Sequence, residues 1–159
     1  MRIGAMADTH DNLPMIRRAV EAFNAEQVEL VIHAGDIVAP FALRPLDELI
    51  CSYLGIFGNN DGDKALLRKR SQGRIGEDPY SLELGERRIL VVHDLESINL
   101  QAEADRHDLI VYGHTHQVDI QKRERALIVN PGEGGGWLYG RSTIAVIELD
   151  DMKAEVIDL

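Results

Sequence analysis

The stretch RIGAMADTH, residues Arg2 to His10, is an apolar run that ends at side chains that can bind a metal. Four further apolar runs end in the same way, at His33-Ala34-Gly35-Asp36, Gly58-Asn59-Asn60-Asp61, His93 and Gly113-His114-Thr115-His116. In an open α/β sheet, ligands bind in the crevice beyond the carboxyl ends of the strands. The sequence therefore predicts one shared site at that edge.

Strand–helix units fill the first half of the chain. Strands are expected over residues 2–7, 29–33 and 52–57. Asp11 and Asn12 can cap a helix whose apolar positions, from Leu13 onward, follow helical spacing. A second helix is expected over residues 41–50, and Asp61 or Asp63 is expected to cap a third, short and basic one.

Short strands dominate the second half. Gly85-Glu86 is typical of a hairpin turn, a helix is expected near residues 95–105, and five short strands are expected to follow it, at 109–112, 118–121, 126–129, 143–149 and 153–157. This number of strands is too high for one doubly wound sheet. We therefore expect a single α/β domain over residues 1–159, a β-sandwich of two sheets flanked by helices on both sides.

Composition excludes some classes of protein. The net charge of −10 argues against nucleic acid as a partner, because phosphate contacts need clustered Lys and Arg, and the basic residues 64–70 are expected to be solvated surface. No apolar stretch reaches the roughly 20 residues of a membrane span. Met1 leads directly into the first strand, which leaves no room for a signal peptide, and Cys51 is expected to be a buried, reduced thiol. These features fit a cytoplasmic protein.

Each candidate residue also has an ordinary structural explanation. Asp8 and His10 are two residues apart, as are His114 and His116, so each pair projects from one face of an extended chain. Either pair alone is equally typical of a cap or a turn. The same holds for Asp36, which follows a glycine at a strand end.

Asn59 is typical of a turn and His93 of a core histidine, but five of the six histidines lie at or near strand ends. Together these residues favour a metal site. His33 is expected to pack beside that site or support it, and His107 is assigned no role.

With these motifs, followed by Asn130-Pro131-Gly132, the chain resembles the calcineurin-like metallophosphoesterase superfamily, and in it the small YfcE-type archaeal and bacterial phosphodiesterases. The resemblance spans almost the whole chain and implies the two-sheet fold. It also implies two divalent cations, held by Asp8, His10 and His116 and by Asn59, His93 and His114, with Asp36 as the bridge. Oxygen and nitrogen donors without thiolate favour Mn²⁺, with Ni²⁺, Fe²⁺ or Zn²⁺ as alternatives.

A site of this kind favours phosphoester hydrolysis. Two cations about 3.5–4 Å apart can lower the pKa of a shared water and clamp a phosphate in line with it. We therefore expect a phosphodiesterase in which hydroxide between the metals attacks the phosphorus of a small phosphorylated substrate. A phosphomonoesterase and a non-catalytic protein-interaction scaffold, as in the related retromer subunit, are the alternatives. A nuclease is disfavoured, and a homo-oligomer is compatible with the sequence.

The sequence departs from the family pattern at Asn60, where many members have a histidine that helps to protonate the leaving group. An amide can donate a hydrogen bond to phosphate but cannot act as a general acid. We therefore expect Asn60 to contact the substrate phosphate, and substrates with good leaving groups to be preferred. His93 is followed by Asp94, where the family often has glycine, which leaves the local loop shape open.

The glycine-rich stretch from Gly132 to Trp137 has two interpretations. We expect a flexible turn whose tryptophan packs in the core. The alternative is that the glycines let the backbone approach a substrate and that Trp137 stacks on a base.

Overall fold

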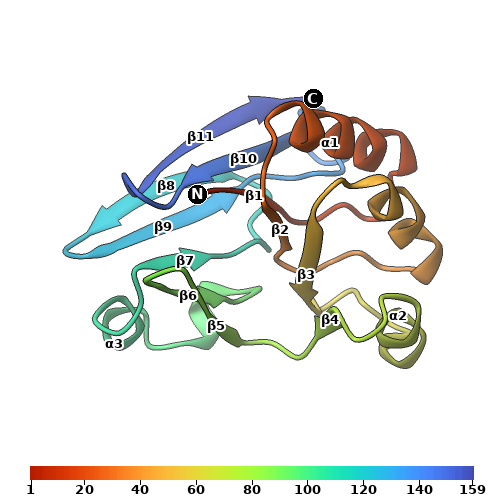
Figure 1. Ribbon diagram of the computed structural model, residues 1–159. Coiled ribbons are helices and arrows are strands. Elements are labelled where there is room, and N and C mark those ends of the chain that lie inside the picture. The colour runs from red at the N-terminus through yellow and green to blue at the C-terminus, as the bar shows by residue number, and fades with distance from the viewer.

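The computed structural model describes residues 1–159 as two β-sheets packed face to face (Figure 1). The first sheet has the order β11-β10-β1-β2-β3-β4 and the second the order β5-β6-β7-β9-β8. The strands of the first sheet are β1 (Arg2–Met6), β2 (Leu30–His33), β3 (Ser52–Ile56), β4 (Ile75–Gly76), β10 (Thr143–Glu148) and β11 (Lys153–Asp158). Those of the second are β5 (Tyr80–Leu84), β6 (Arg87–Val91), β7 (Leu109–Val111), β8 (Val118–Arg123) and β9 (Ala126–Pro131).

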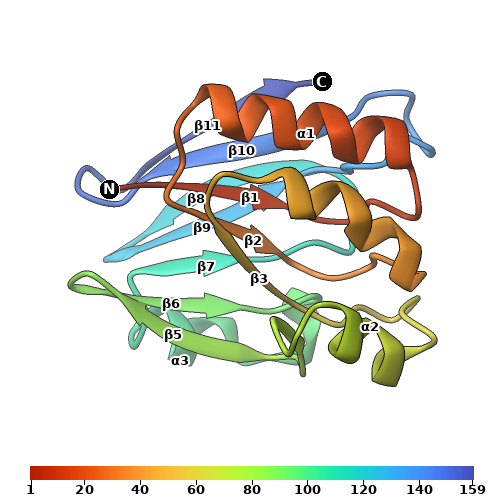
Figure 2. The same cartoon turned by 45° about the vertical axis from the view of Figure 1, so that its right-hand side comes forward.

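Helices cover the outer face of each sheet, as predicted (Figures 1 and 2). The first sheet is covered by α1 (Leu13–Ala25), the 3₁₀ helix η1 (Pro40–Glu48) and α2 (Lys64–Arg70). The second is covered by the short 3₁₀ helix η2 (Leu95–Ser97) and α3 (Leu100–Ala104). None of these helices has the length and apolar content that a membrane span requires.

The caps of the two longest α-helices follow from the sequence. Asn12 caps α1 by accepting from the Met15 backbone N–H, and Asp63 caps α2 by accepting from the Leu66 N–H. Asp63 is therefore the cap of the basic helix, and Asp61 is not.

Two expected helices differ in the structure. The segment expected to be a helix over residues 41–50 is the 3₁₀ helix η1, because Pro45 inside it lacks the N–H that an α-helical bond needs. The helix expected over residues 95–105 breaks at Asn99, whose side chain accepts from the Ala102 N–H and starts α3 anew. Cys51 is only partly buried, and it is free.

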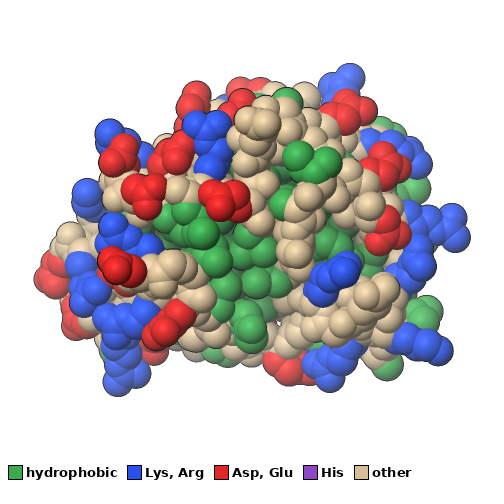
Figure 3. Space-filling view, viewed as in Figure 1, with side chains coloured by type: hydrophobic (Ala, Val, Ile, Leu, Met, Phe, Trp, Pro, Cys, Tyr) green, Lys and Arg blue, Asp and Glu red, His purple; other side chains and the backbone are tan.

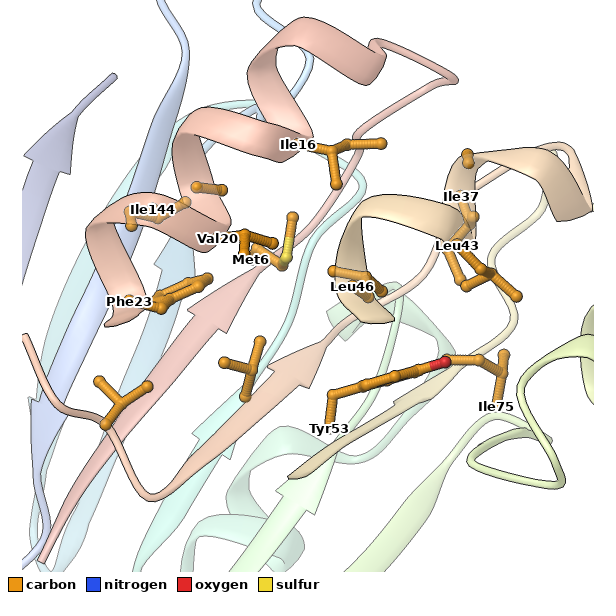
Figure 4. Packing of buried hydrophobic residues seen from close by; sticks show 14 of the residues in the cluster. Met6, Ile16, Val20, Phe23, Ile37, Leu43, Leu46, Tyr53, Ile75 and Ile144 are labelled. Atoms are coloured by element: carbon orange, nitrogen blue, oxygen red, sulfur yellow. The ribbon is translucent and has the colours of Figure 1, made fainter. Parts of the chain in front are cut away.

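The core consists of an outer apolar layer on each side and one layer between the sheets. Side chains alternate along β1, so that Ile3 and Ala5 face the layer between the sheets and Met6 faces α1. In Figure 4, Val20 and Phe23 of α1 lie against Met6. This packing fixes β1 and the loop that follows it.

Parallel pairing aligns the strand ends that carry the predicted site. β1, β2 and β3 are parallel, as are β6, β7 and β9. In Figure 2 the arrowheads of β1, β2, β6 and β7 point to the same side. The loops after these strands therefore meet at one edge of the molecule. The histidines that they carry do not lie on the face shown in Figure 3, where no histidine is visible.

Phe23 tests the outer layer, because it is completely buried. Replacing Phe23 by Ala should lower the free energy of unfolding by about 3–5 kcal/mol, measured by urea denaturation of the metal-free protein. Phe41→Ala is the matched control, since Phe41 is 46% exposed, and should change it by about 0.5 kcal/mol or less. Equal losses from the two variants would contradict the packing described.

Candidate metal centre

The structure brings all seven predicted metal ligands together at the edge where the two sheets meet. They come from five loops, each of which follows a strand. Asp8 and His10 follow β1, Asp36 follows β2, Asn59 follows β3, His93 follows β6, and His114 and His116 follow β7.

The first predicted ligand group, Asp8, His10 and His116, converges on one point. The Nε2 atoms of His10 and His116 are 3.4 Å apart, and the two rings stack with centroids 5.0 Å apart. Asp8 Oδ1 lies 3.7 Å from His116 Nε2 and 4.0 Å from His10 Nε2. The ligand atoms of the three residues lie within 4.8 Å of one another, which suits one shared cation.

The second predicted group converges on the amide oxygen of Asn59. This oxygen lies 2.9 Å from His93 Nε2 and 3.0 Å from His114 Nδ1. The other ring nitrogen of His93, Nδ1, is 2.8 Å from the Ala34 carbonyl oxygen. A ring whose second nitrogen donates to a carbonyl presents Nε2 as a lone pair, the form in which histidine binds a metal.

Asp36 lies between the two groups. Its Oδ2 is 3.6 Å from His10 Nε2 in the first group and 3.5 Å from His93 Nε2 in the second. Asp8 is also near both, since its ligand atom lies within 4.8 Å of those of Asp36 and His93. Asp36 therefore contacts a histidine of each group.

The strand ends turn toward the site through an uncommon backbone conformation. Five of the predicted ligands have positive φ, a left-handed region that residues other than glycine seldom adopt. Such residues cost about 1–3 kcal/mol each and cluster at functional sites. The angles are 52° at Asp8, 40° at His10, 60° at Asp36, 69° at His114 and 59° at His116.

Two of the seven predicted ligands, Asp36 and Asn59, follow a position that only glycine can occupy. Gly35 has φ of +96°, and a Cβ there would lie 2.5 Å from His93 Nδ1. A Cβ on Gly58 would collide with the Asp36 carboxylate. The glycines that precede Asp36 and Asn59 therefore let the loops approach closely enough to bring their polar side chains together.

Burial and mutual contacts set the charges of the site. Burial raises the pKa of Asp8 to about 7. Burial alone would also raise the pKa of Asp36, but hydrogen bonds from His93 and Asn60 hold it well below its usual range. Burial alone would lower the pKa of His93, but its contacts with Asp36 and the Ala34 carbonyl raise it to about 9.

These residues fit a pair of divalent cations. Asp8 and Asp36 are 0% and 1% exposed, and histidines are the only cationic groups that contact them. A buried carboxylate needs a compensating charge, which a bound cation supplies. Carboxylate, amide and imidazole donors without a thiolate suit a transition metal such as Mn²⁺, Fe²⁺, Ni²⁺ or Zn²⁺.

Asn60 has a structural role that the sequence did not predict. Its backbone N–H donates to Asp36 Oδ1 at 2.8 Å, and its amide Nδ2 donates to Asp36 Oδ2 at 2.7 Å. Asn60 thus holds the carboxylate that lies between the two groups. One N–H of its exposed amide is left for the predicted contact with a phosphate.

Asp61 is a buried support that the sequence suggested only as a helix cap. Its carboxylate accepts from the backbone N–H groups of Asp36, Gly58 and Val38, at 3.1, 2.7 and 2.6 Å. It therefore ties the loop after β2 to the loop after β3. Its place in the same strand-end motif as Asn59 is the one signal that could have indicated this role.

Glu133 is a second support that sequence reasoning missed. It is 1% exposed, its Oε1 lies 3.2 Å from His116 Nδ1, and it accepts from the backbone N–H groups of Trp137 and Leu138. A carboxylate this close to the second ring nitrogen of a ligand histidine raises the basicity of the ring as a ligand. No local pattern indicates this contact, because Glu133 and His116 are 17 positions apart.

The remaining histidines lie off the cluster. His33 is buried, and burial lowers its pKa. Its Nε2 is 3.0 Å from the hydroxyl of Thr9, so the ring supports the loop between Asp8 and His10. His107 contacts Ser81 and the Glu103 carbonyl, on the side of the molecule that carries α3.

The expectation that Trp137 packs in the core is wrong. Trp137 is 63% exposed, and its indole N–H donates to the His10 carbonyl oxygen at 3.0 Å. The loop before it is held to the strand end, since Gly134 and Gly135 donate to the carbonyls of Ala7 and Asp8. Trp137 is therefore fixed in position while most of its surface faces solvent.

Fold and site together define a metallophosphoesterase-type centre, and the sequence comparisons agree. The calcineurin-like phosphoesterase superfamily domain matches residues 1–152, and the chain belongs to this superfamily. It is similar to phosphodiesterase MJ0936 of Methanocaldococcus jannaschii, at 35% identity over 165 residues that cover 100% of this chain and 99% of the relative. A probable metallophosphoesterase of Methanothermobacter thermautotrophicus is 30% identical over 172 residues, covering 99% and 92%.

Solved structures confirm the predicted fold. The structure of an archaeal phosphodiesterase superposes with a TM-score of 0.93 at 34% identity, over 100% of both chains. YfcE, a phosphoesterase from E. coli, has a TM-score of 0.74 at 18% identity, covering 99% of this chain and 98% of the other. Zinc-bound Vps29 from Entamoeba histolytica has 0.73 at 16%, covering 99% of each. The last two share the fold.

Glu133 tests how the site is supported. Because Glu133→Gln keeps an acceptor for the backbone N–H groups but removes the charge behind His116, it should lower Mn²⁺ affinity about 10- to 100-fold. Calorimetric titration of the metal-free protein measures this change. Glu83→Gln, on the exposed face of β5, is the control and should bind Mn²⁺ as the parent does. Unchanged affinity in a folded Glu133→Gln variant would rule out the supporting role.

Proposed function

We propose that this chain is a two-metal phosphodiesterase that hydrolyses small phosphodiesters. The observation that carries the proposal is the position of Asp36 Oδ2, within 3.6 Å of a histidine from each of two converging ligand groups. The proposed ligands are Asp8, His10 and His116 for one cation, Asn59, His93 and His114 for the other, and Asp36 for both.

The proposed cofactor is a pair of divalent cations, with Mn²⁺ preferred over Ni²⁺, Fe²⁺ or Zn²⁺ because the set includes an amide oxygen. When bound, such a pair activates water for attack on phosphorus and neutralises charge on the nonbridging oxygens.

The chain's own residues prepare the site for a phosphate. The buried carboxylates Asp8 and Asp36 offset the repulsion between two cations, and Asn60 keeps Asp36 oriented through two hydrogen bonds. The histidines are neutral as ligands, so a net positive charge remains to face the substrate. The Asn60 amide can donate a hydrogen bond, but it is too weak an acid to protonate a departing alkoxide.

The relatives support a diester as the substrate. The relative at 35% identity is named a phosphodiesterase, and so is the archaeal protein whose structure superposes over the whole chain. The free thiol of Cys51 is compatible with a reducing compartment, and we propose a cytoplasmic location.

Hydrolysis of bis(p-nitrophenyl) phosphate tests the proposal. The protein with Mn²⁺ should release nitrophenolate, and a chelator should abolish the release. Asp36→Asn, nearly identical in shape, should lower the rate about 100-fold or more and weaken metal binding. Asp47→Asn, an exposed carboxylate paired with Arg70, is the matched control and should not change the rate.

A protein-interaction scaffold on the same fold is the competing function. Stoichiometric transition metal in the protein, with no hydrolysis of any phosphodiester or phosphomonoester, would favour the scaffold. Faster hydrolysis of monoesters than of diesters would favour a phosphomonoesterase.

Asn60 predicts how the rate depends on the leaving group. The parent should cleave p-nitrophenyl esters well and alkyl esters poorly, whereas Asn60→His should accelerate alkyl esters by about 100-fold because it supplies a proton. Asn60→Ala controls for loss of the contact with Asp36 and should slow all esters alike. If the parent already cleaves alkyl esters as fast as Asn60→His does, the prediction fails.

A further inference from the structure

A cavity of about 260 Å³ opens directly beside the proposed metal centre. One of its lining residues is His116, a proposed ligand, so a group in the cavity would lie beside the proposed metal centre. The other lining residues are Gln117, Val118, Tyr139, Arg141 and Thr143.

No acidic side chain lines this cavity, so nothing in its wall repels an anionic substrate. The chain as a whole has 27 Asp and Glu residues and a net charge of −10. A larger cavity of about 460 Å³, beside β10 and β11, is lined by Glu26, Glu148 and Glu155 as well as Arg2 and Lys153. Those carboxylates would repel a phosphorylated molecule, so the cavity beside His116 is the better candidate.

Tyr139 supplies an aromatic wall that is exposed yet held in place. It is 60% exposed, and its hydroxyl oxygen accepts from Gln117 Nε2 at 3.5 Å. The backbone before it is held by buried Glu133, which accepts from the N–H groups of Trp137 and Leu138. Since Glu133 also contacts His116, the loop that carries Tyr139 is built on the metal centre itself.

Polar donors lie at the rim of the same cavity. Arg141 is anchored by Asp158, which accepts from its Nε and from one terminal nitrogen, so its remaining N–H groups are free to donate. Gln117 adds an amide. An aromatic wall with hydrogen-bond donors at its edge matches a flat ring that carries carbonyl or ring-nitrogen acceptors.

We propose that this cavity binds a nucleobase of the substrate diester, stacked on Tyr139, with Arg141 and Gln117 at the polar edge of the ring. The inference rests on the proposed function and names its substrate class, a small nucleotide-derived phosphodiester. Base stacking on an aromatic side chain strengthens binding, so removing Tyr139 should weaken binding about tenfold or more.

Diesters that share one leaving group test the proposal. They are thymidine 5′-(p-nitrophenyl phosphate), phenyl p-nitrophenyl phosphate and methyl p-nitrophenyl phosphate, compared with Mn²⁺ present. The parent should have its lowest KM for the thymidine ester, and Tyr139→Ala should raise that KM about tenfold more than the KM for the methyl ester. Tyr139→Phe should keep most of the preference, because its ring still stacks.

Tyr80→Ala is the matched control, since Tyr80 is 47% exposed on β5, outside the cavity, and should change no KM. Equal KM values for the thymidine and methyl esters in the parent would overturn the proposal. An equally low KM for the phenyl ester would overturn the assignment to a nucleobase. If Tyr139→Ala alters only the oligomeric state, the loop is a protein contact and the proposal is wrong.

A binding measurement separates this proposal from the proposed function. Saturation-transfer NMR of thymidine 5′-monophosphate with the Zn²⁺-loaded protein should show transfer to the base protons, which Tyr139→Ala abolishes. That result supports the cavity even if no ester is hydrolysed. Absence of transfer to the base in the parent overturns the cavity, whatever the hydrolysis rates.

Discussion

The buried carboxylates of Asp8 and Asp36 constrain the whole edge of the sandwich. Both lie where the two sheets meet, and only histidines offset their charge. Burial raises the pKa of Asp8 to about 7, while contacts with His93 and Asn60 hold the pKa of Asp36 low, so Asp36 is ionised at neutral pH and Asp8 is partly protonated. Bound cations would compensate the charge of both carboxylates, which would couple metal binding to the stability of the fold.

The rest of the fold serves to hold this arrangement. Parallel strands bring five loops to one edge, and ligand residues with positive φ turn their side chains inward at a cost in backbone energy. Buried acceptors oppose that cost: Asp61 ties together the loops after β2 and β3, and Glu133 joins His116 to the loop of Trp137. The loop that steadies a proposed metal ligand therefore also forms the wall of the adjacent cavity, so substrate recognition and metal binding share one support.

The two-sheet fold and the strand ends could be predicted from sequence, because an apolar run that stops at a glycine and a polar residue is a local signal. Long-range contacts left no such signal: Asn60 bonds to Asp36, 24 positions away, and the contact of Glu133 with His116 becomes visible only when β7 and β9 are paired. Pro45 is a local signal that the helix prediction overlooked. Because proline has no N–H for an α-helical hydrogen bond, the segment expected to be an α-helix is a 3₁₀ helix. The prediction that Trp137 packs in the core failed because its place in the sequence, an aromatic residue after glycines, does not show whether the side chain faces the core or solvent.

Anomalous diffraction from crystals of the Mn²⁺-loaded protein would show whether Asp36 bridges two cations, because it locates each cation against the side chains. Two peaks per chain are expected, with a carboxylate oxygen of Asp36 bound to both. Asp8, His10 and His116 should complete one coordination sphere, and Asn59, His93 and His114 the other. A single peak, or two peaks of which Asp36 contacts only one, would rule out the proposed two-metal site.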